Sequence, residues 1–154
     1  MTRMIRGFTM LEVIVVVVVI GILAAMVIPR FANAQSTTAT ATAAEDLRRI
    51  AGAIELYQGV NGSFPPNASR TEDAAILDTY FKNESPFEIQ SSIGGVYDYE
   101  NTSTVAVVIL QDGANQYTHE DALALDVYMD DGDLTTGRLQ EVGNSLRYRF
   151  GEIN

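Results

Sequence analysis

The densest group of side chains that could bind a metal ion lies in the last third of the chain. Its members all carry carboxylates, the oxygen ligands that Ca²⁺ takes in proteins. They are Asp126, Asp130, Asp131, Asp133 and Glu141. Their spacing differs from an EF-hand loop, because Val127 and Met129 stand where that loop needs ligands. A candidate calcium site therefore competes with a simpler interpretation, a solvated helix end that stops at the Gly132 turn.

Residues for covalent or acid–base catalysis are scarce. The chain contains no cysteine, which excludes disulfides, thiolate metal sites and a thiol nucleophile. Its single histidine, His119, excludes any mechanism that needs two imidazoles. His119 stands beside acidic residues at an expected helix start, where a surface position is a better interpretation than a catalytic base. Since no nucleophile–base pair or metal triad is visible, the sequence predicts that the protein is not an enzyme.

The charge of the chain argues against a nucleic-acid partner. The 154 residues include 10 basic and 20 acidic side chains, a formal net charge of −10. A surface of this sign repels phosphate backbones, and no cluster of Lys and Arg offers a binding patch. We therefore expect no direct contact with nucleic acid.

The N-terminal residues predict a membrane-spanning helix. Residues 1–7 include Arg3 and Arg6 and no acid. Residues 8–28 then form an apolar stretch close to the roughly 20 residues that cross a bilayer. The positive residues would keep the N-terminus in the cytoplasm and place the rest of the chain beyond the membrane. Glu12 stands within this stretch, and a carboxylate in an apolar span is costly and usually functional.

Two simple interpretations leave Glu12 unexplained. One is a plain membrane anchor. The other is a secretory signal peptide, because residues 32–34 (Ala-Asn-Ala) resemble a small-residue cleavage site. Cleavage there would release a binding or enzymatic domain that begins at Gln35. Against this alternative, the apolar stretch is longer than the roughly 7–15 residues usual in signal peptides.

A third interpretation accounts for Glu12. Residues 7–12, Gly-Phe-Thr-Met-Leu-Glu, and the apolar run to Ile28 resemble the prepilin N-terminus shared by type IV pilins and type II secretion pseudopilins. The resemblance implies that a prepilin peptidase cuts after Gly7 and methylates the new terminal residue, Phe8. Glu12 then falls at the fifth place of the trimmed chain, where the family has its glutamate.

The resemblance also divides the chain. It implies a leader peptide (residues 1–7), a transmembrane, filament-core helix (8–30) and a periplasmic part (31–154) that joins the helix continuation to a globular head. Without the leader, eight basic and 20 acidic residues remain, a formal charge of −12.

Glu12 has a physical role in this interpretation. Cleavage creates a positive amine at Phe8, at a depth where water is scarce. Glu12 of a neighbouring subunit can neutralise that amine, and a low dielectric strengthens the pair. Assembly would thus satisfy two charges that are costly alone in lipid.

One long helix is expected to begin the fold. It would run from Phe8 to about Gln58, with kinks at Gly21 and Pro29, which are also family positions. Residues 32–46 are mostly Ala, Ser and Thr, and they suit a slim helix, with a flexible linker as the alternative. After them an apolar stripe recurs at three- and four-residue steps and should pack on the head. The stripe is Leu47, Ile50, Ala51, Ile54 and Tyr57.

The head is expected to be a small α+β domain with an antiparallel sheet. Residues 96–100 and 104–110 read as a hairpin, after a turn at Gly94 and Gly95. A short helix is expected around residues 72–81, and another begins at residues 118–121 with a cap and early acids. Residues 145–150 alternate apolar and polar side chains, as expected of a last strand. A sheet of about three strands is therefore expected to pack on the helical stripe.

The resemblance implies a structural function. Subunits anchored once in the bacterial inner membrane, with a periplasmic head, would be taken from the lipid bilayer by an inner-membrane assembly platform. They would stack with other copies or related pilin subunits into a filament. The alternatives are a type II secretion pseudopilus and a type IV pilus for adhesion, motility or DNA uptake. The lack of cysteine and the pattern of residues 57–65 favour a pseudopilin. Major pseudopilins carry calcium in a C-terminal loop, so the resemblance implies calcium as the candidate cofactor of the acidic loop.

Overall fold

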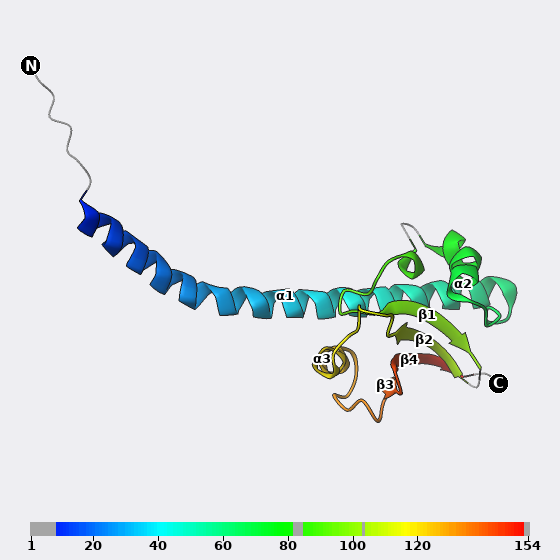
Figure 1. Ribbon diagram of the computed structural model, residues 1–154. Coiled ribbons are helices and arrows are strands. Elements are labelled where there is room, and N and C mark those ends of the chain that lie inside the picture. The colour runs from blue at the N-terminus through cyan, green and yellow to red at the C-terminus, as the bar shows by residue number, and fades with distance from the viewer. Residues whose placement is uncertain (1–8, 82–84, 103, 153–154) are drawn as a thin grey trace, which may run out of the picture. The chain divides into compact units, whose positions relative to one another are not determined.

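The computed structural model describes residues 9–81, 85–102 and 104–152 of the chain, without the side chains of residues 27–34 and 152 (Figure 1). The chain divides into two compact units, residues 1–35 and 36–154. Each unit is a structure of its own, and helix α1 (Met10–Asn61) contributes to both.

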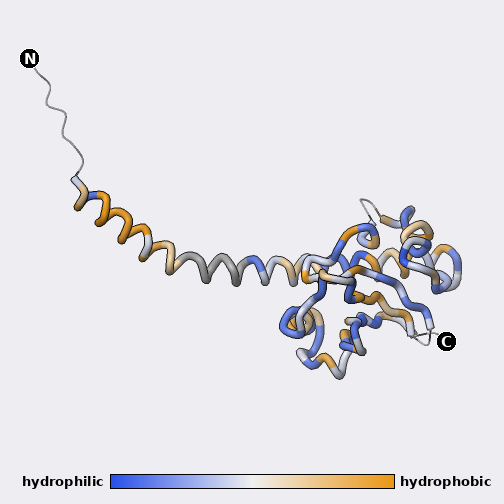
Figure 2. Tube along the Cα trace, viewed as in Figure 1, coloured by the Kyte–Doolittle hydropathy of each residue, from blue (hydrophilic) through white to orange (hydrophobic). Residues whose placement is uncertain are grey.

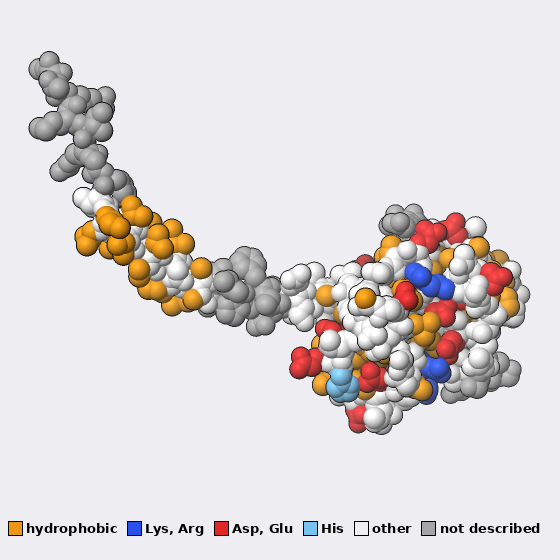
Figure 3. Space-filling model, viewed as in Figure 1, with side chains coloured by type: hydrophobic (Ala, Val, Ile, Leu, Met, Phe, Trp, Pro, Cys, Tyr) orange, Lys and Arg blue, Asp and Glu red, His pale blue; other side chains and the backbone are white. Residues whose placement is uncertain are grey.

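The first unit consists of the apolar beginning of α1. Its large apolar side chains from Met10 to Met26 are all exposed, by 49% to 83% of their surface (Figures 2 and 3). Over the residues that the structure describes, no helix combines the length and the apolar character needed to cross a membrane. The predicted span, residues 8–28, includes Phe8 and two side chains at residues 27 and 28 that lie outside the described residues.

The second unit is the α+β head that the sequence predicts. Its described residues form a four-stranded antiparallel sheet in the order β1-β2-β4-β3. The strands are β1 (Val96–Asn101), β2 (Thr104–Leu110), β3 (Leu139–Val142) and β4 (Ser145–Glu152). Shorter helical elements are α2 (Arg70–Leu77), η1 (Asp78–Tyr80), η2 (Pro86–Glu88) and α3 (His119–Met129).

The head core forms between α1 and one face of the sheet. The predicted stripe is confirmed, because Leu47, Ile50 and Ile54 are fully buried in it. They share the core with Val107 and Ile109 of the central strand β2, whose side chains are also fully buried. Burying one such side chain stabilises the fold by about 1.5–3 kcal/mol. The head therefore has a core of its own.

A polar contact also joins α1 to the sheet. The Tyr97 hydroxyl of β1 donates to Asp46 Oδ2 over 3.3 Å, and Arg49 pairs with Asp46 Oδ1 at 3.1 Å. Burial raises the pKa of the Asp46 carboxyl, whereas the Arg49 charge and the Tyr97 bond lower it. A buried acid on the core side of the helix is thus held by a donor from the sheet and a cation from its own helix.

The predicted elements differ from the structure mainly at their edges. The hairpin of β1 and β2, the last strand and the capped helix α3 are confirmed. The helix expected over residues 72–81 is α2 followed by the single turn η1. Strand β3 is an addition to the expected sheet. Residues 36–46 are helical, which decides between the slim helix and the linker in favour of the helix.

Gly94 and Gly95 form the turn that leads into β1. Both have positive φ angles, of 106° and 83°. A Cβ on Gly95 would lie 2.5 Å from the Leu110 carbonyl oxygen, in the neighbouring strand of the hairpin. A side chain at this position is excluded both by the backbone angle and by the close approach of β2.

We therefore expect Gly95→Ala to destabilise the head by about 2–4 kcal/mol, from left-handed strain and overpacking together. Gly143→Ala is the matched control, because Gly143 also has positive φ (62°) but nothing lies within 4 Å of its Cβ position. The control should cost about 1–2 kcal/mol. Denaturant unfolding of both variants measures the difference, and equal losses would contradict a role for the Leu110 contact.

Candidate assembly and cation sites

The first described turn of α1 is closed by Thr9 and Glu12. The Thr9 backbone N–H and its hydroxyl both donate to Glu12 Oε2, each over 2.8 Å. The Glu12 N–H donates back to the Thr9 hydroxyl oxygen over 3.3 Å. This reciprocal arrangement is a capping box, which satisfies backbone donors that a helix start leaves free. Within its own chain Glu12 therefore caps the helix while its side chain stays exposed.

Sequence reasoning assigned no role to Thr9. The signal was present, because a Ser or Thr three residues before an acid marks a helix start. The same pattern begins the other two α-helices of the described chain, as Ser69 with Glu72 and Thr118 with Asp121. Gly7 and Phe8, the predicted processing and methylation residues, lie outside the described residues.

The structure gives different information on the two predicted kinks, at Gly21 and at Pro29. A Cβ on Gly21 would meet nothing within 4 Å, so packing within this chain does not require a glycine there. The side chain of Pro29 lies outside the described residues. Both kinks stay predictions.

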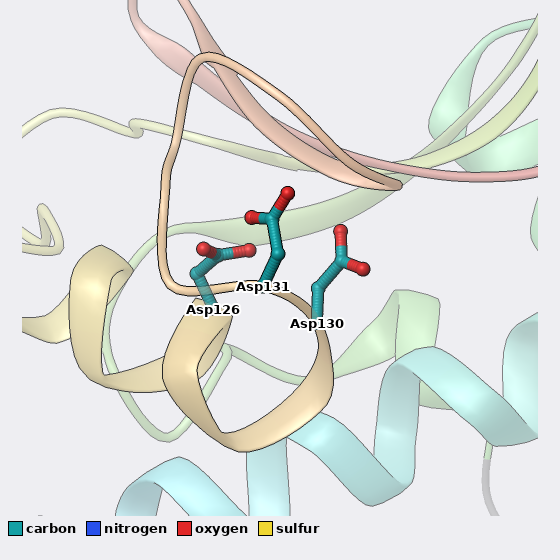
Figure 4. Close-up of side chains that lie close together, drawn as sticks. All are labelled: Asp126, Asp130 and Asp131. Atoms are coloured by element: carbon teal, nitrogen blue, oxygen red, sulfur yellow. The ribbon is translucent and has the colours of Figure 1, made fainter.

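Three of the five candidate calcium ligands come together at the end of α3. Asp126 lies on the helix, and Asp130 and Asp131 follow its last residue (Figure 4). One carboxylate oxygen from each residue lies within 4.8 Å of the others. Asp133 is not part of this trio. Its Oδ1 accepts the Thr135 N–H over 2.9 Å and the Thr135 hydroxyl over 2.7 Å.

Asp126 is the unusual member of the trio. Its residue is fully buried, and neither carboxylate oxygen has a hydrogen-bond partner among the described residues. Burial raises the pKa of Asp126, and the negative charges of Asp131 and Asp130 raise it further. The apolar neighbour Val127 is 67% exposed. The helix thus turns an acid inward and a valine outward, the reverse of what α3 would do to build a core.

The other two acids of the trio are fixed by the loop. Asp130 Oδ2 accepts the N–H groups of Arg138 and Leu139, at the start of β3. Asp131 accepts the Asp133 N–H over 3.0 Å and the Thr136 hydroxyl over 2.8 Å. These bonds hold two carboxylates in place beside the buried one. The arrangement offers several oxygen ligands to a hard cation, and a bound cation would neutralise the buried charge of Asp126.

The remaining candidate residues form a separate pair. His119 Nδ1 lies 3.0 Å from Glu141 Oε2, and the His119 side chain is 72% exposed. Glu141 is therefore engaged outside the trio, and His119 occupies the surface position that the sequence predicts.

The chain is similar to a described motif and to curated proteins. The prokaryotic N-terminal methylation motif matches residues 2–28. The type II secretion system core protein G of Pseudomonas aeruginosa is 39% identical over 59 residues, which cover 38% of this chain and 42% of that protein. Core protein G of Escherichia coli strain K12 is 35% identical over 60 residues, covering 39% and 41%. The match thus spans about two fifths of the length of these relatives.

A solved structure has a similar fold. The major type IV pilin PilA1 of Clostridium difficile superposes with a TM-score of 0.52 and 14% identity, over 74% of this chain and 95% of that one. The motif, the relatives and the fold together support the family of type IV pilins and type II secretion pseudopilins. Within that family, the named relatives support the pseudopilin interpretation.

The geometry of the trio makes a prediction about the ion-free head. Replacing Asp126 by Asn in the presence of a chelator should raise its stability at neutral pH by about 1–2 kcal/mol, because a buried, unpartnered charge is removed. A raised pKa means that the folded state keeps its proton longer, so the parent loses stability as pH rises through that pKa. The gain should therefore vanish in acid. Thermal unfolding over pH measures it, and a loss of stability at every pH would contradict the assignment.

Proposed function

We propose that the protein is a structural subunit of a type IV pilus-like filament and, within that class, a type II secretion pseudopilin. Its proposed partners are a prepilin peptidase that cuts after Gly7 and methylates Phe8, an inner-membrane assembly platform, and other copies or related subunits. The observation that carries the proposal is the apolar, exposed start of α1 with Glu12 capping it. The methylation motif over residues 2–28 and the core protein G relatives support it. A filament subunit needs no catalytic site, which agrees with the composition.

The subunit is proposed to wait in the inner membrane, with its head in the periplasm. The large apolar side chains between Met10 and Met26 are exposed among the described residues, so lipid or neighbouring helices are proposed to cover them. The head carries its own core and a strongly acidic composition, which suit an aqueous compartment. Type IV pilus pilin is the alternative within the same family, and the pilin-like fold is common to both.

The role of Glu12 in assembly follows from its two possible partners. In the single chain the carboxylate caps its own helix through Thr9. In the filament it would also neutralise the amine of Phe8 on a neighbouring subunit, which no cap can replace. Helix capping and assembly are therefore separable properties of one side chain. A glutamine can still accept the Thr9 bonds through its amide oxygen, but it carries no charge.

The acidic loop is proposed to bind a divalent cation, with calcium as the expected ion. Asp126, Asp130 and Asp131 would supply ligands, and the ion would join the end of α3 to the start of β3 through Asp130. The buried, unpartnered carboxylate of Asp126 carries this proposal, because a solvated helix end would not bury an acid without a partner. The cation would then be a structural part of the head.

The filament proposal predicts that Glu12→Gln is cut after Gly7 and stays in the membrane but fails to assemble. Filament yield should fall by about tenfold or more, because the Phe8 amine loses its counter-charge at each contact. Immunoblots of sheared filaments and membranes, with mass spectrometry of the N-terminus, measure each step. Gly7→Val is the control for processing and should leave uncut precursor. Normal filament yield from Glu12→Gln would refute the assignment.

The cation proposal predicts that millimolar Ca²⁺ raises the melting temperature of the head. At one hundred times the dissociation constant the gain is about 2.7 kcal/mol. Asp126→Asn should abolish the increment. Asp133→Asn, outside the trio, should keep most of it and so tests the geometry. A melting temperature that does not change with Ca²⁺ would contradict the cation site, and the loop would then be a simple turn.

A further inference from the structure

A second buried acid lies in the head, away from the acidic loop. Asp73, in the first turn of α2, is 1% exposed, and neither of its carboxylate oxygens has a hydrogen-bond partner among the described residues. Helix α2 packs against strand β1 and the turn η2. Asp73 takes part neither in the proposed filament assembly through α1 nor in the proposed cation site of the acidic loop.

Asp73 faces another acid across the contact between α2 and β1. Asp98 of β1 has a buried Oδ1 that also lacks a partner among the described residues. The two carboxyls become hydrogen-bonding neighbours once one of them carries a proton. Two carboxylates in one buried place cannot both ionise without a large cost, and sharing one proton removes that cost.

The charged groups around the pair are engaged elsewhere. The Glu72 carboxylate accepts bonds from Ser69, and Glu100 of β1 pairs with Arg147 of β4 at 3.2 Å. The Tyr99 hydroxyl of β1 donates to the Pro65 carbonyl. The nearest cation in sequence is Arg70, which bonds the Ile89 carbonyl through Nη2 at 3.4 Å, while its Nε is buried without a partner among the described residues.

Arg70 also stands at the edge of a shallow hollow on the side of α2 and η2. Asp78 of η1 and Glu88 of η2 line that hollow, and both are exposed. Burial raises the pKa of Asp98, the bond from the Tyr99 N–H lowers it, the Glu100 charge raises it and the Arg70 charge lowers it. Among the described residues, Arg70 makes no ion pair with Asp73 or Asp98.

We infer that in acidic surroundings Asp73 and Asp98 hold one proton between them in the folded head, and that this shared proton holds α2 against strand β1 until the pH rises through neutrality. The contact between α2 and β1 is thereby sensitive to pH. It holds α2 in place in acidic surroundings and loosens it as the pH rises through neutrality, while the core between α1 and the sheet stays formed.

The electrostatics of the pair agree with this. Burial raises the pKa of Asp73 to about 7, and the charge of Asp98 adds to the shift. A folded-state pKa above the unfolded value means that the folded state binds more protons between the two values. Stability therefore falls as pH rises from about 4 to about 7 and beyond that stays at its lower level.

The test uses the full chain in neutral detergent micelles. From pH 5 to pH 8.5 the melting temperature of the parent should fall by roughly 5 °C or more. Asp73→Asn should remove a large part of that fall, because an amide supplies the donor without titrating; the rest comes from Asp46 and Asp126, whose pKa values are also raised. Amide hydrogen exchange of residues 70–77 should speed up at pH 8.5 in the parent more than in the variant.

Matched variants separate this pair from the other titrating groups. Asp78→Asn removes an exposed acid of the same segment and should leave the parent's pH profile intact. Asp98→Asn should move the pH dependence to lower pH, because the new amide donates to the Asp73 carboxylate. Should Asp73→Asn fail to fold, carboxyl NMR of ¹³C-aspartate in the parent decides, with one midpoint near 7 expected. A parent-like profile for Asp73→Asn, or aspartate midpoints all below about 5, would overturn the inference.

Discussion

The large apolar side chains at the beginning of α1 are exposed among the residues that the structure describes, and the rest of the protein depends on this constraint. The large apolar side chains between Met10 and Met26 are at least 49% exposed. Their burial is worth about 25 cal/mol for each Å² removed from water, so the segment needs lipid or other helices around it. The head must then fold without that segment. It does so by covering a different stretch of α1, whose buried stripe begins after residue 40.

Local signals predicted most of the head. The stripe on α1, the hairpin and the capped start of α3 each depend on residues near one another in sequence, so periodicity and capping rules found them. Strand β3 escaped because Leu139–Val142 is four residues long and buries only Leu139 among them. The place of β4 between β2 and β3 is a long-range pairing, which periodicity cannot determine.

The sites divide in the same way. Glu12 was found from sequence because a charge in an apolar run is conspicuous, whereas its bond to Thr9 required attention to a capping pattern. The acidic loop was found from composition, but composition could not separate Asp133, which closes a turn, from the three acids that meet. Asp73 and Asp98 are 25 positions apart, and nothing local predicts that α2 brings them together.

Three buried acids in this head show how a strongly acidic chain can tolerate charge in its interior. Asp46 has a cation and a hydroxyl donor, Arg49 and Tyr97, and needs nothing further. Asp126 has neither, but two more carboxylates lie beside it, and the proposed divalent cation would compensate the charge of all three. Asp73 meets a single acid, Asp98, too few ligands for a hard ion but sufficient to share a proton. In these proposals the neighbours of each acid determine whether an ion pair, a metal ion or a proton compensates its charge. Because the last two come from the surroundings, the two ends of the head are expected to respond to different solutes, α3 to divalent cations and α2 to pH.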